Sequence, residues 1–388
     1  MGTGIAIAAL DAGLEVMLLE HDAAALQRGT TRIKEHYAHR VAAGKVSADK
    51  VAECESLLHA TTDWNALAPI DLVIEAVFED MAVKREVFAR LDKIARPGAI
   101  LATNTSYLDV DVIAAATARP RDVVGLHFFS PANVMRLVEV VRGAATSPDV
   151  LATAVDVAKR LGKLPVVTGN AFGFVGNRIF SAYRRQCEFM LEEGALPDEV
   201  DAALEAFGFA MGPFAVADMS GLDIAWRMRQ SQAATRDPQA RYVRIPDMLC
   251  ETGRLGRKTG AGYYLYSDGS GKARGQVDTG VHDLIASASA EKRIERRSLS
   301  ADEIQRRALL AMVNEAALVV AEGVAQEAGD VDVVLLNGYG FPRSEGGPVT
   351  WARKRGARAL QADLEWLAQR SGPGFVPGDP RHLLEEAA

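Results

Sequence analysis

His127, at the end of an expected strand, is a candidate for acid–base chemistry. A free imidazole titrates near neutral pH, so a histidine can serve as a general acid or base. Ser106 and Asn177 are two further polar residues, to which residue type alone assigns no role. Each of the three residues also has a purely structural interpretation. A single histidine at a strand end more often has a structural role, a serine after a strand suits a turn, and an asparagine suits the start of a helix. Residue types alone leave both interpretations open.

A second chemical signal lies at the start of the chain, where MGTGIAIAALDAGLEVMLLEHD contains a small-residue helix ending at Gly13, a hydrophobic strand and an acid, Glu20. In dinucleotide-binding folds such an acid holds the adenosine ribose hydroxyls, and an acid here favours NAD over NADP. The GxGxxG pattern cannot be completed within the chain, since a start at Gly2 puts Ile7 where a small residue is needed. Gly2 instead fits the third glycine of that pattern, whose first two glycines would lie before the given sequence. The alternative is that Gly2 and Gly4 belong to a disordered start.

We therefore expect the first strand and glycine turn of the nucleotide fold to be missing from this chain. The loss would expose two unpaired edges in the middle of a sheet. From this we expect the natural polypeptide to begin upstream, at an earlier start or as the tail of a longer fusion protein.

The elements that must position these residues alternate as in a parallel sheet with helices on both faces. Helical spacing over Met81–Ala95 gives one apolar face, and Pro97-Gly98 ends that helix. The expected strands are Glu15–Glu20, Asp71–Ala76, Ala99–Asn104, Val123–Phe129 and Leu137–Val141.

After about Thr168 the sequence becomes helical, which predicts three further segments: a helical domain over 169–265, a linker over 266–300 and a second helical domain over 301–388. The nucleotide domain occupies 1–168. Residues Leu191–Phe209 recur loosely as Ala321–Phe341, each followed by Gly-Pro, which favours an internal duplication over chance similarity of glycine-capped helices.

Composition excludes several classes of protein. The 388 residues are 48% hydrophobic and 24% charged, which is ordinary for a globular chain of two to three domains. The net charge of -7 offers no global positive field for nucleic acid. No apolar run approaches the roughly 18 residues of a membrane span. The three cysteines are far apart and fit no metal-ligand spacing, so we expect no metal site.

From Asn104 onward the chain resembles the 3-hydroxyacyl-CoA dehydrogenase family, in particular the dehydrogenase part of multifunctional β-oxidation enzymes of the peroxisomal bifunctional type. The matching stretches keep the family order over nearly the whole chain: NTSYL (104–108), GLHFFSPANVMRLVEVVRG (125–143), GNAFGFVGNRIF (169–180), FGFAMGPFAVADMSGLD (207–223), IPDMLCETGRLGRKTGAGYY (245–264) and NGYGFPRSEGGP (337–348). The implied fold is an α/β Rossmann-type domain followed by two all-α C-terminal domains of this family.

The resemblance assigns the catalytic residues. His127 matches the family's base, and Glu139 matches the carboxylate that the family places twelve residues later to accept the other imidazole N–H. Ser106 and Asn177 match the residues that hold the substrate oxygen. Asn177 lies sixteen residues before Glu193, and the same count back from Glu322 in the second copy reaches Arg306. The second copy therefore lacks the asparagine, and we expect it to be a scaffold rather than a second site.

For the cofactor, NAD, the resemblance assigns Glu79, Lys84 and Asn104 in addition to Gly2 and Glu20. On sequence alone, Glu79 and Lys84 would be an ordinary charged pair at a helix start. The basic segment Arg28–Lys50 lies where the family binds the nucleotide end of coenzyme A, although a solvated charged face is an equal alternative.

The resulting expectation is NAD-dependent oxidation of (S)-3-hydroxyacyl-CoA to 3-oxoacyl-CoA in β-oxidation, with a fused or partnered enoyl-CoA hydratase. One alternative is an inactive fragment or scaffold that cannot hold NAD. Another is a hydroxyacid dehydrogenase of similar build, which is disfavoured because those relatives commonly use lysine as base. Because Glu385-Glu386-Ala387-Ala388 carries no peroxisomal address, we expect a bacterial cytoplasmic enzyme.

Overall fold

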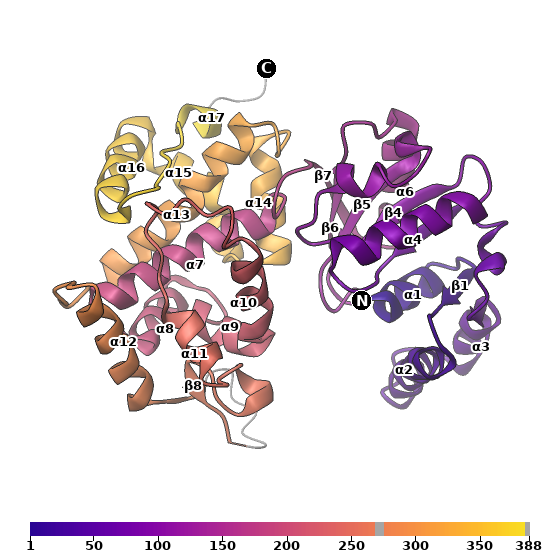
Figure 1. Ribbon diagram of the computed structural model, residues 1–388, viewed down its shortest axis with the longest axis horizontal. Helices are drawn as coiled ribbons and strands as arrows, with labels where there is room; N and C mark the ends of the chain where they lie inside the picture. The colour runs from indigo at the N-terminus through magenta and orange to yellow at the C-terminus, as the bar shows by residue number, and fades with distance from the viewer. Residues whose placement is uncertain (268–274, 385–388) are drawn as a thin grey trace. The chain divides into compact units, whose positions relative to one another are not determined.

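The computed structural model describes residues 1–267 and 275–384 and divides into two compact units (Figure 1). The first unit comprises Met1–Asn177 together with Gly323–Gln326. The second comprises Arg178–Glu322 and the residues from Glu327 onward. All the predicted site residues lie in the first unit.

The first unit contains two sheets. The larger has the strand order β3-β4-β5-β6-β7, and the smaller pairs β1 with β2 in parallel. The pair β5 and β6 is antiparallel, whereas the other pairs are parallel. Only a short loop joins β5 to β6, and a parallel pair would need a crossover of a dozen or more residues. The strands are β1 (Val16–Leu19), β2 (Leu58–Thr61), β3 (Leu72–Glu75), β4 (Ile100–Thr103), β5 (Val123–Phe128), β6 (Leu137–Arg142) and β7 (Leu164–Gly169).

Helices cover both faces of the larger sheet. Alternate residues of a strand point to opposite faces, so Leu101 packs with α4 and α5, while Ala102 packs with α1 and α6. The domain therefore has the doubly wound build that the sequence predicts. The helices of the first unit are α1 (Gly2–Asp11), α2 (Ala23–Ala42), α3 (Ala48–Ser56), α4 (Met81–Ile94), α5 (Val110–Ala114) and α6 (Pro148–Arg160), with short 3-10 turns at Trp64–Leu67 and Pro120–Asp122.

The two sheets are not joined by hydrogen bonds, since no strand of the described chain pairs with both β1 and β3. Helix α1 covers both: its Ile5 belongs to the core of the larger sheet, and its Leu10 belongs to the core around α2. Most side chains of β1 and β3 are only half-buried. This arrangement agrees with the expectation of a Rossmann-type sheet that lacks a strand.

The second unit is helical, with one short antiparallel pair, β8 (Tyr264–Leu265) and β9 (Gln276–Val277). Its helices are α7 (Gly176–Glu193, which begins in the first unit), α8 (Pro197–Phe207), α9 (Pro213–Ser220), α10 (Leu222–Ser231), α11 (Ile245–Glu251), α12 (Thr279–Glu291), α13 (Ala301–Ala321), α14 (Ala328–Gly338), α15 (Pro348–Arg355), α16 (Ala357–Ser371) and α17 (Arg381–Leu384), with 3-10 turns at Arg257–Thr259 and Arg343–Glu345.

Reciprocal ion pairs join the two helical copies. Arg178 of α7 donates to Glu322, which follows α13, with Nη2 and Oε1 2.8 Å apart, and Arg307 of α13 donates to Glu193 of α7 at 2.9 Å between the same atoms. The two arginines, like the two glutamates, are 129 residues apart in the sequence. Each copy thus supplies an arginine to the glutamate of the other copy.

A buried aspartate caps a later helix in each copy. Asp201 accepts the N–H groups of Phe214 and Ala215 at the start of α9, both at 3.0 Å. Asp332 accepts those of Val349 and Thr350 at the start of α15, at 2.8 and 3.0 Å. Burial raises the pKa of Asp201 to about 7 despite these donors.

The segment 266–300, predicted to be a linker, contains helix α12 within its described part. Val281, Ile285 and Ala288 lie on the buried face of α12 at helical spacing, among serines and alanines that weaken the sequence signal. Strands β2 and β7 also lacked a predicted counterpart.

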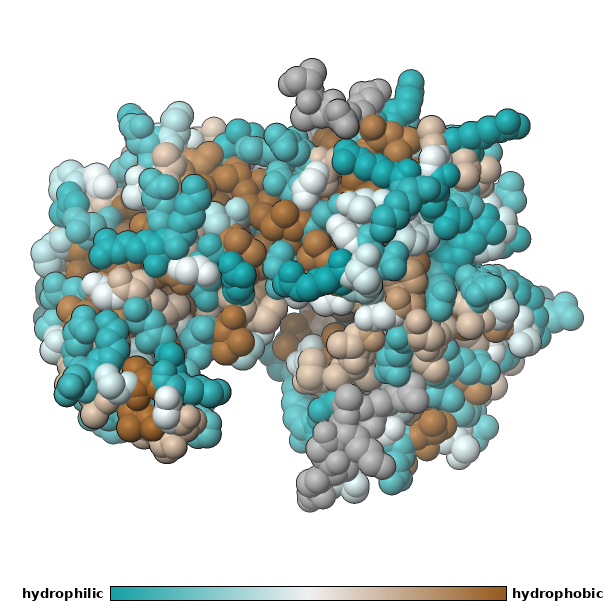
Figure 2. All heavy atoms as spheres, turned by 180° about the vertical axis from the view of Figure 1, so that it is seen from behind, coloured by the Kyte–Doolittle hydropathy of each residue, from teal (hydrophilic) through white to brown (hydrophobic). Residues whose placement is uncertain are grey.

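The surface seen in Figure 2 is mostly hydrophilic, with hydrophobic residues in separate patches. Among the described residues, no helix has both the length and the apolar character needed to cross a membrane.

Candidate active site

His127 and Glu139 face each other across the antiparallel pair β5 and β6. They are direct register partners, so their side chains lie on the same face of the sheet. The imidazole Nδ1 is 2.7 Å from Oε2 of Glu139. The side chain of His127 is 6% exposed and that of Glu139 is fully buried. This geometry assigns the Nδ1 proton to the hydrogen bond with the carboxylate and leaves Nε2 as the basic nitrogen.

The other carboxylate oxygen of Glu139 is held by the start of α7. Oε1 accepts the N–H groups of Val175 and Gly176, at 3.1 and 2.9 Å. A helix start favours negative charge, so these contacts stabilise the ionised carboxylate. The preceding residue, Phe174, has a φ of 48°, which side chains other than glycine rarely adopt, and it is fully buried beside the imidazole. The strained turn therefore directs two amides at Glu139.

Ser106 and Asn177 meet in the same unit. The side-chain amide of Asn177 donates to the carbonyl oxygen of Ser106 at 3.2 Å. Asn177 directly follows Gly176, whose amide binds Glu139, so the two contacts connect His127, Glu139, Asn177 and Ser106 through one short segment. Within the described residues no group bonds to the Ser106 hydroxyl, which leaves that hydroxyl able to bind a substrate oxygen.

Three residues predicted to contact NAD lie around this cluster. Asn104 is buried, and its Oδ1 accepts the N–H of Phe128, next to His127, at 2.8 Å. Glu79 accepts the N–H of Ser106 at 2.8 Å. Lys84 is fully buried against Glu75, whose Oε1 is 2.8 Å from its Nζ. In this structure all three residues bind neighbouring protein groups.

Gly2 and Gly4 bring the start of α1 close to the carboxyl ends of the strands. A Cβ at Gly2 would lie 3.8 Å from that of Ala76, just after β3, and one at Gly4 would lie 3.3 Å from that of Ala132, in the loop after β5. In the described chain no side chain caps this helix start. Free N–H groups at a helix start, approached through small residues, suit a pyrophosphate.

Glu20 directly follows β1 and lies two residues before Asp22, the residue that caps α2. Its side chain is 36% exposed, and its nearest ionic partner is His21, 3.7 Å away. An accessible carboxylate at this strand end suits the ribose hydroxyls of a dinucleotide. The residues at this edge thus fit the adenosine and pyrophosphate end of NAD. In the described part of the chain, no group of three or more His, Cys, Asp or Glu side chains is placed to hold a metal ion.

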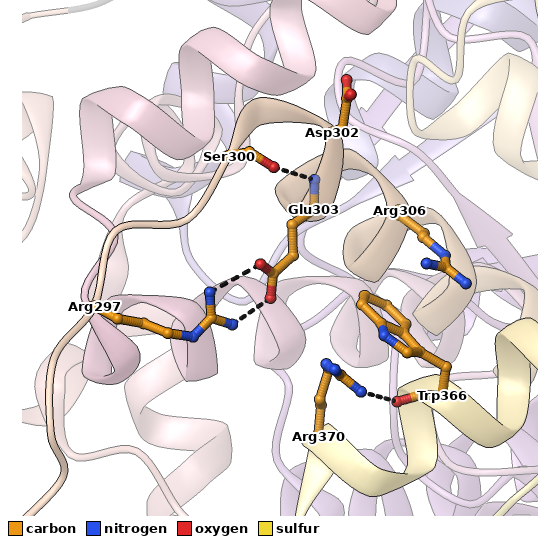
Figure 3. Close-up of a pocket in the computed structure, with 7 residues that line it drawn as sticks. All are labelled: Arg297, Ser300, Asp302, Glu303, Arg306, Trp366 and Arg370. Atoms are coloured by element: carbon orange, nitrogen blue, oxygen red, sulfur yellow. Dashed lines mark hydrogen bonds and ion pairs between the residues drawn. The ribbon is translucent and has the colours of Figure 1, made fainter.

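The second helical copy has a cleft at the position that corresponds to Asn177 in the first copy. Arg306 stands there, with its Nε 3.1 Å from Asp363, and it lines an open cavity of about 500 Å³ (Figure 3). In this cleft Arg297 pairs with Glu303, and Arg306 and Arg370 each lie over the ring of Trp366. Carboxylates compensate two of the three guanidinium charges, so the cleft carries no strong positive field.

Sequence reasoning missed Glu75 and Phe174. The apolar run Leu72–Ala76 includes Glu75, and an acid inside a buried strand requires a cationic partner, so the sequence did carry a signal for it. Nothing in the sequence marks Phe174 as a residue with positive φ.

The fold and the site together define a nucleotide-dependent dehydrogenase with a histidine–glutamate pair, and the comparisons with known proteins agree. Residues 1–171 match the NAD-binding domain of 3-hydroxyacyl-CoA dehydrogenase, and residues 173–266 match its C-terminal domain. The chain belongs to the 3-hydroxyacyl-CoA dehydrogenase family.

Three relatives illustrate the match. The peroxisomal bifunctional enzyme of Cavia porcellus is 40% identical over all of this chain and 54% of its own length. The 3-hydroxybutyryl-CoA dehydrogenase of Escherichia coli K12 is 28% identical, covers 96% of both chains and has a TM-score of 0.79. The dehydrogenase part of multifunctional enzyme 1 from C. elegans is 33% identical over 88% of this chain and 76% of its own, with a TM-score of 0.60.

The chain spans about half the length of curated relatives that it matches, 54% and 47% in two of them. These comparisons contradict the expectation of a bacterial cytoplasmic enzyme, because curated relatives are named as peroxisomal or glyoxysomal proteins of animals and plants. That expectation rested on four terminal residues. A targeting address is read by a receptor and is independent of the fold, so the absence of one address motif was a weak argument.

Proposed function

We propose that this chain catalyses the NAD-dependent oxidation of (S)-3-hydroxyacyl-CoA to 3-oxoacyl-CoA. The observation that carries the proposal is the buried pair of His127 and Glu139, with Glu139 fixed by the start of α7. This pair gives one nitrogen, Nε2, the role of base. The names of the E. coli and C. elegans relatives support the same reaction.

In the proposed mechanism, Nε2 of His127 accepts the proton of the substrate's C3 hydroxyl. The carboxylate of Glu139 keeps the second imidazole proton on Nδ1 and stabilises the imidazolium that forms. The Ser106 hydroxyl and the Asn177 amide bind the substrate oxygen, which holds its O–H toward the imidazole. Gly2 and Glu20 would hold NAD, which would supply the acceptor for the hydride of C3.

The cofactor-binding role is proposed for Gly2 and Glu20 most directly. The uncapped start of α1 suits the pyrophosphate and the accessible carboxylate of Glu20 suits the ribose. For Glu79, Lys84 and Asn104 the cofactor contact is proposed from the family resemblance, and each of these residues also binds a neighbouring protein group.

We further propose that the chain works with an enoyl-CoA hydratase, either fused to it or as a partner. The bifunctional and multifunctional names of relatives about twice as long as the matched region support this proposal. A hydratase would supply the 3-hydroxyacyl thioester that the dehydrogenase consumes.

One observation favours the alternative of a scaffold that cannot hold NAD. The strands β1 and β3 belong to separate sheets, so the edge that would carry the cofactor lacks the strand pairing that normally makes it rigid. Binding of NADH by the chain, followed by nucleotide fluorescence, separates the two proposals.

The decisive experiment follows NADH oxidation at 340 nm with acetoacetyl-CoA, in the chain and in the variant His127→Gln. We expect turnover that falls by about 10² to 10⁴ in the variant, the range for loss of a general acid–base group. NADH binding without turnover would reject the proposed activity, and no NADH binding would favour the scaffold.

A further inference from the structure

Lys163, directly before β7, is a buried cation whose hydrogen bonds all go to the backbone of one loop. The residue is 8% exposed, and its Nζ donates to the carbonyl oxygens of Ala132 and Met135, the latter at 2.8 Å. Among the described residues no carboxylate pairs with it. Burial lowers the pKa of its ammonium group. Because a buried cation is costly unless its protons are bound, these two charge-assisted hydrogen bonds hold the loop firmly.

The loop that Lys163 holds joins β5 to β6 and comprises residues 129–136. A turn within the loop is closed by the carbonyl oxygen of Pro131, which accepts the N–H groups of Val134 and Met135, both at 2.9 Å. The ammonium group therefore binds the loop on either side of this turn. The start of β7 and the middle of the loop are thus connected through a single side chain.

Ala132 is the loop residue against which the start of α1 packs. It is 2% exposed and belongs to the same hydrophobic core as Ile5 of α1. A Cβ at Gly4 would lie 3.3 Å from both the Cβ and the backbone nitrogen of Ala132. Since no strand of the described chain joins β1 to β3 by hydrogen bonds, α1 depends on packing contacts of this kind for its place. Lys163 therefore binds the carbonyl group of the residue that supports the helix start.

We propose that Lys163 is a positioning residue for the cofactor, which fixes the start of α1 by fixing Ala132. The free N–H groups of that helix start are proposed to bind the pyrophosphate of NAD, and their hydrogen bonds weaken steeply when the donors are misaligned. Lys163 itself donates to the loop and does not contact the nucleotide. The inference rests on the proposed function for the identity of the ligand, whereas the order of the loop can be measured without any ligand.

The first test compares nucleotide binding by the full chain, by Lys163→Met and by Lys159→Met, an exposed control on α6. The nucleotides are NADH and ADP-ribose, which carries the adenosine and pyrophosphate groups without the nicotinamide. In Lys163→Met we expect both Kd values to rise by about tenfold, the effect of one or two weakened charge-assisted hydrogen bonds. In Lys159→Met both should stay unchanged.

Hydrogen exchange reports the loop directly. The amides of Val134 and Met135 should exchange about tenfold faster in Lys163→Met and at the wild-type rate in Lys159→Met, because only the first variant loses the clamp on their turn. The kcat at saturating NAD should change by less than about threefold, since the contacts of His127 and Glu139 do not involve Lys163.

Three results would contradict the inference. A folded Lys163→Met with unchanged Kd values would show a lysine that only stabilises the fold. A loss of kcat with unchanged affinity for ADP-ribose would mean that the loop acts on the catalytic histidine and not on the helix start. Wild-type exchange of both loop amides would exclude the clamp. A wild-type chain that binds neither nucleotide would instead reject the proposed function, and the exchange rates would still decide whether Lys163 orders the loop.

A second variant approaches the same contact from α1 and leaves Lys163 in place. In Gly4→Ala the new methyl group must push the helix start and Ala132 apart, so the Kd for ADP-ribose should rise by about three- to tenfold. Gly29→Ala on α2 is the matched control, because a Cβ there would meet Leu18 at an ordinary contact distance of 3.5 Å. Equal affinities in these two variants would exclude the loop as a support of the helix start.

The double variant Gly4→Ala with Lys163→Met shows whether the two changes disturb one contact. Its Kd for ADP-ribose should exceed that of the weaker-binding single variant by less than about threefold, because a contact that is already lost cannot be lost again. Losses that multiply fully would show that Gly4 and Lys163 act on the nucleotide separately, and the proposed route from Lys163 through Ala132 to α1 would fail.

Discussion

The contacts of Glu139 predict that its conservative replacement by glutamine harms activity more than its truncation to alanine. In the structure, Oε1 of Glu139 accepts two backbone N–H groups, those of Val175 and Gly176, while Oε2 faces Nδ1 of His127 at 2.7 Å. A glutamine must place its carbonyl oxygen where the two amides donate. Its NH₂ group then points at Nδ1, which has to accept a proton instead of donating one.

The consequence for the imidazole is a change of tautomer. With Nδ1 as acceptor, the proton of the neutral ring moves to Nε2, the nitrogen proposed to act as base. The wrong tautomer of a catalytic histidine costs about 10⁴ in kcat in a serine-protease triad, or about 5 kcal/mol of transition-state stabilisation at 1.36 kcal/mol per tenfold. We therefore expect Glu139→Gln to lower kcat by about 10³ to 10⁴.

In Glu139→Ala the imidazole is free to adopt either tautomer, so part of the population keeps Nε2 as the base. The lost stabilisation of the imidazolium should lower kcat by only about 10², within the range for a weakened general base. The variant should also be less stable by about 1 to 3 kcal/mol for each amide that is left without an acceptor. The expected order of activity is wild type, then alanine, then glutamine.

The assay is NAD reduction at 340 nm with saturating (S)-3-hydroxybutyryl-CoA, paired with ¹⁵N NMR of labelled histidine to identify the protonated nitrogen of His127. A glutamine variant as active as the alanine variant, or one whose His127 keeps its proton on Nδ1, would refute this reasoning. Because NMR reports the tautomer directly, the structural part is decided even if the chain does not turn over.

Three further predictions concern stability and cofactor binding. Arg307→Met should lower the free energy of unfolding in urea by about 3 kcal/mol and Arg178→Met by about 1, because their side chains are 0% and 20% exposed; equal losses would contradict this. Burial raises the pKa of Asp201 to about 7 and that of Asp218 to about 6. Stability should therefore fall as pH rises from about 4 to 7, by about 1.4 kcal/mol per pKa unit, and then level off; a rise over that interval would be the wrong sign. Glu20→Ala should weaken NADH binding by about tenfold without changing the thermal unfolding midpoint, and unchanged affinity would exclude the ribose contact.

The sequence predicted the parts of the fold and site that depend on local pattern. Strands over Asp71–Ala76 and Val123–Phe129 were readable because apolar runs and turn residues mark them. The long-range contacts were not readable: the ion pair of Glu75 and Lys84 joins a strand to a helix, and the positive φ of Phe174 is set by the tertiary packing of its turn. The family resemblance matched Glu79 and Lys84 to cofactor contacts, but it did not show that both side chains also contact protein groups.

The two helical copies separate what the fold needs from what the chemistry needs. Both copies keep a buried aspartate that caps a helix, in Asp201 and Asp332, and both keep the arginine that binds the other copy's glutamate. These contacts hold helices in place wherever the copy lies. Asn177 has no counterpart in the second copy. The corresponding residue there is Arg306, which pairs with Asp363. An amide that binds the Ser106 turn is useful only beside that turn, so the difference between Asn177 and Arg306 supports the proposal that one copy is catalytic and the other is its scaffold.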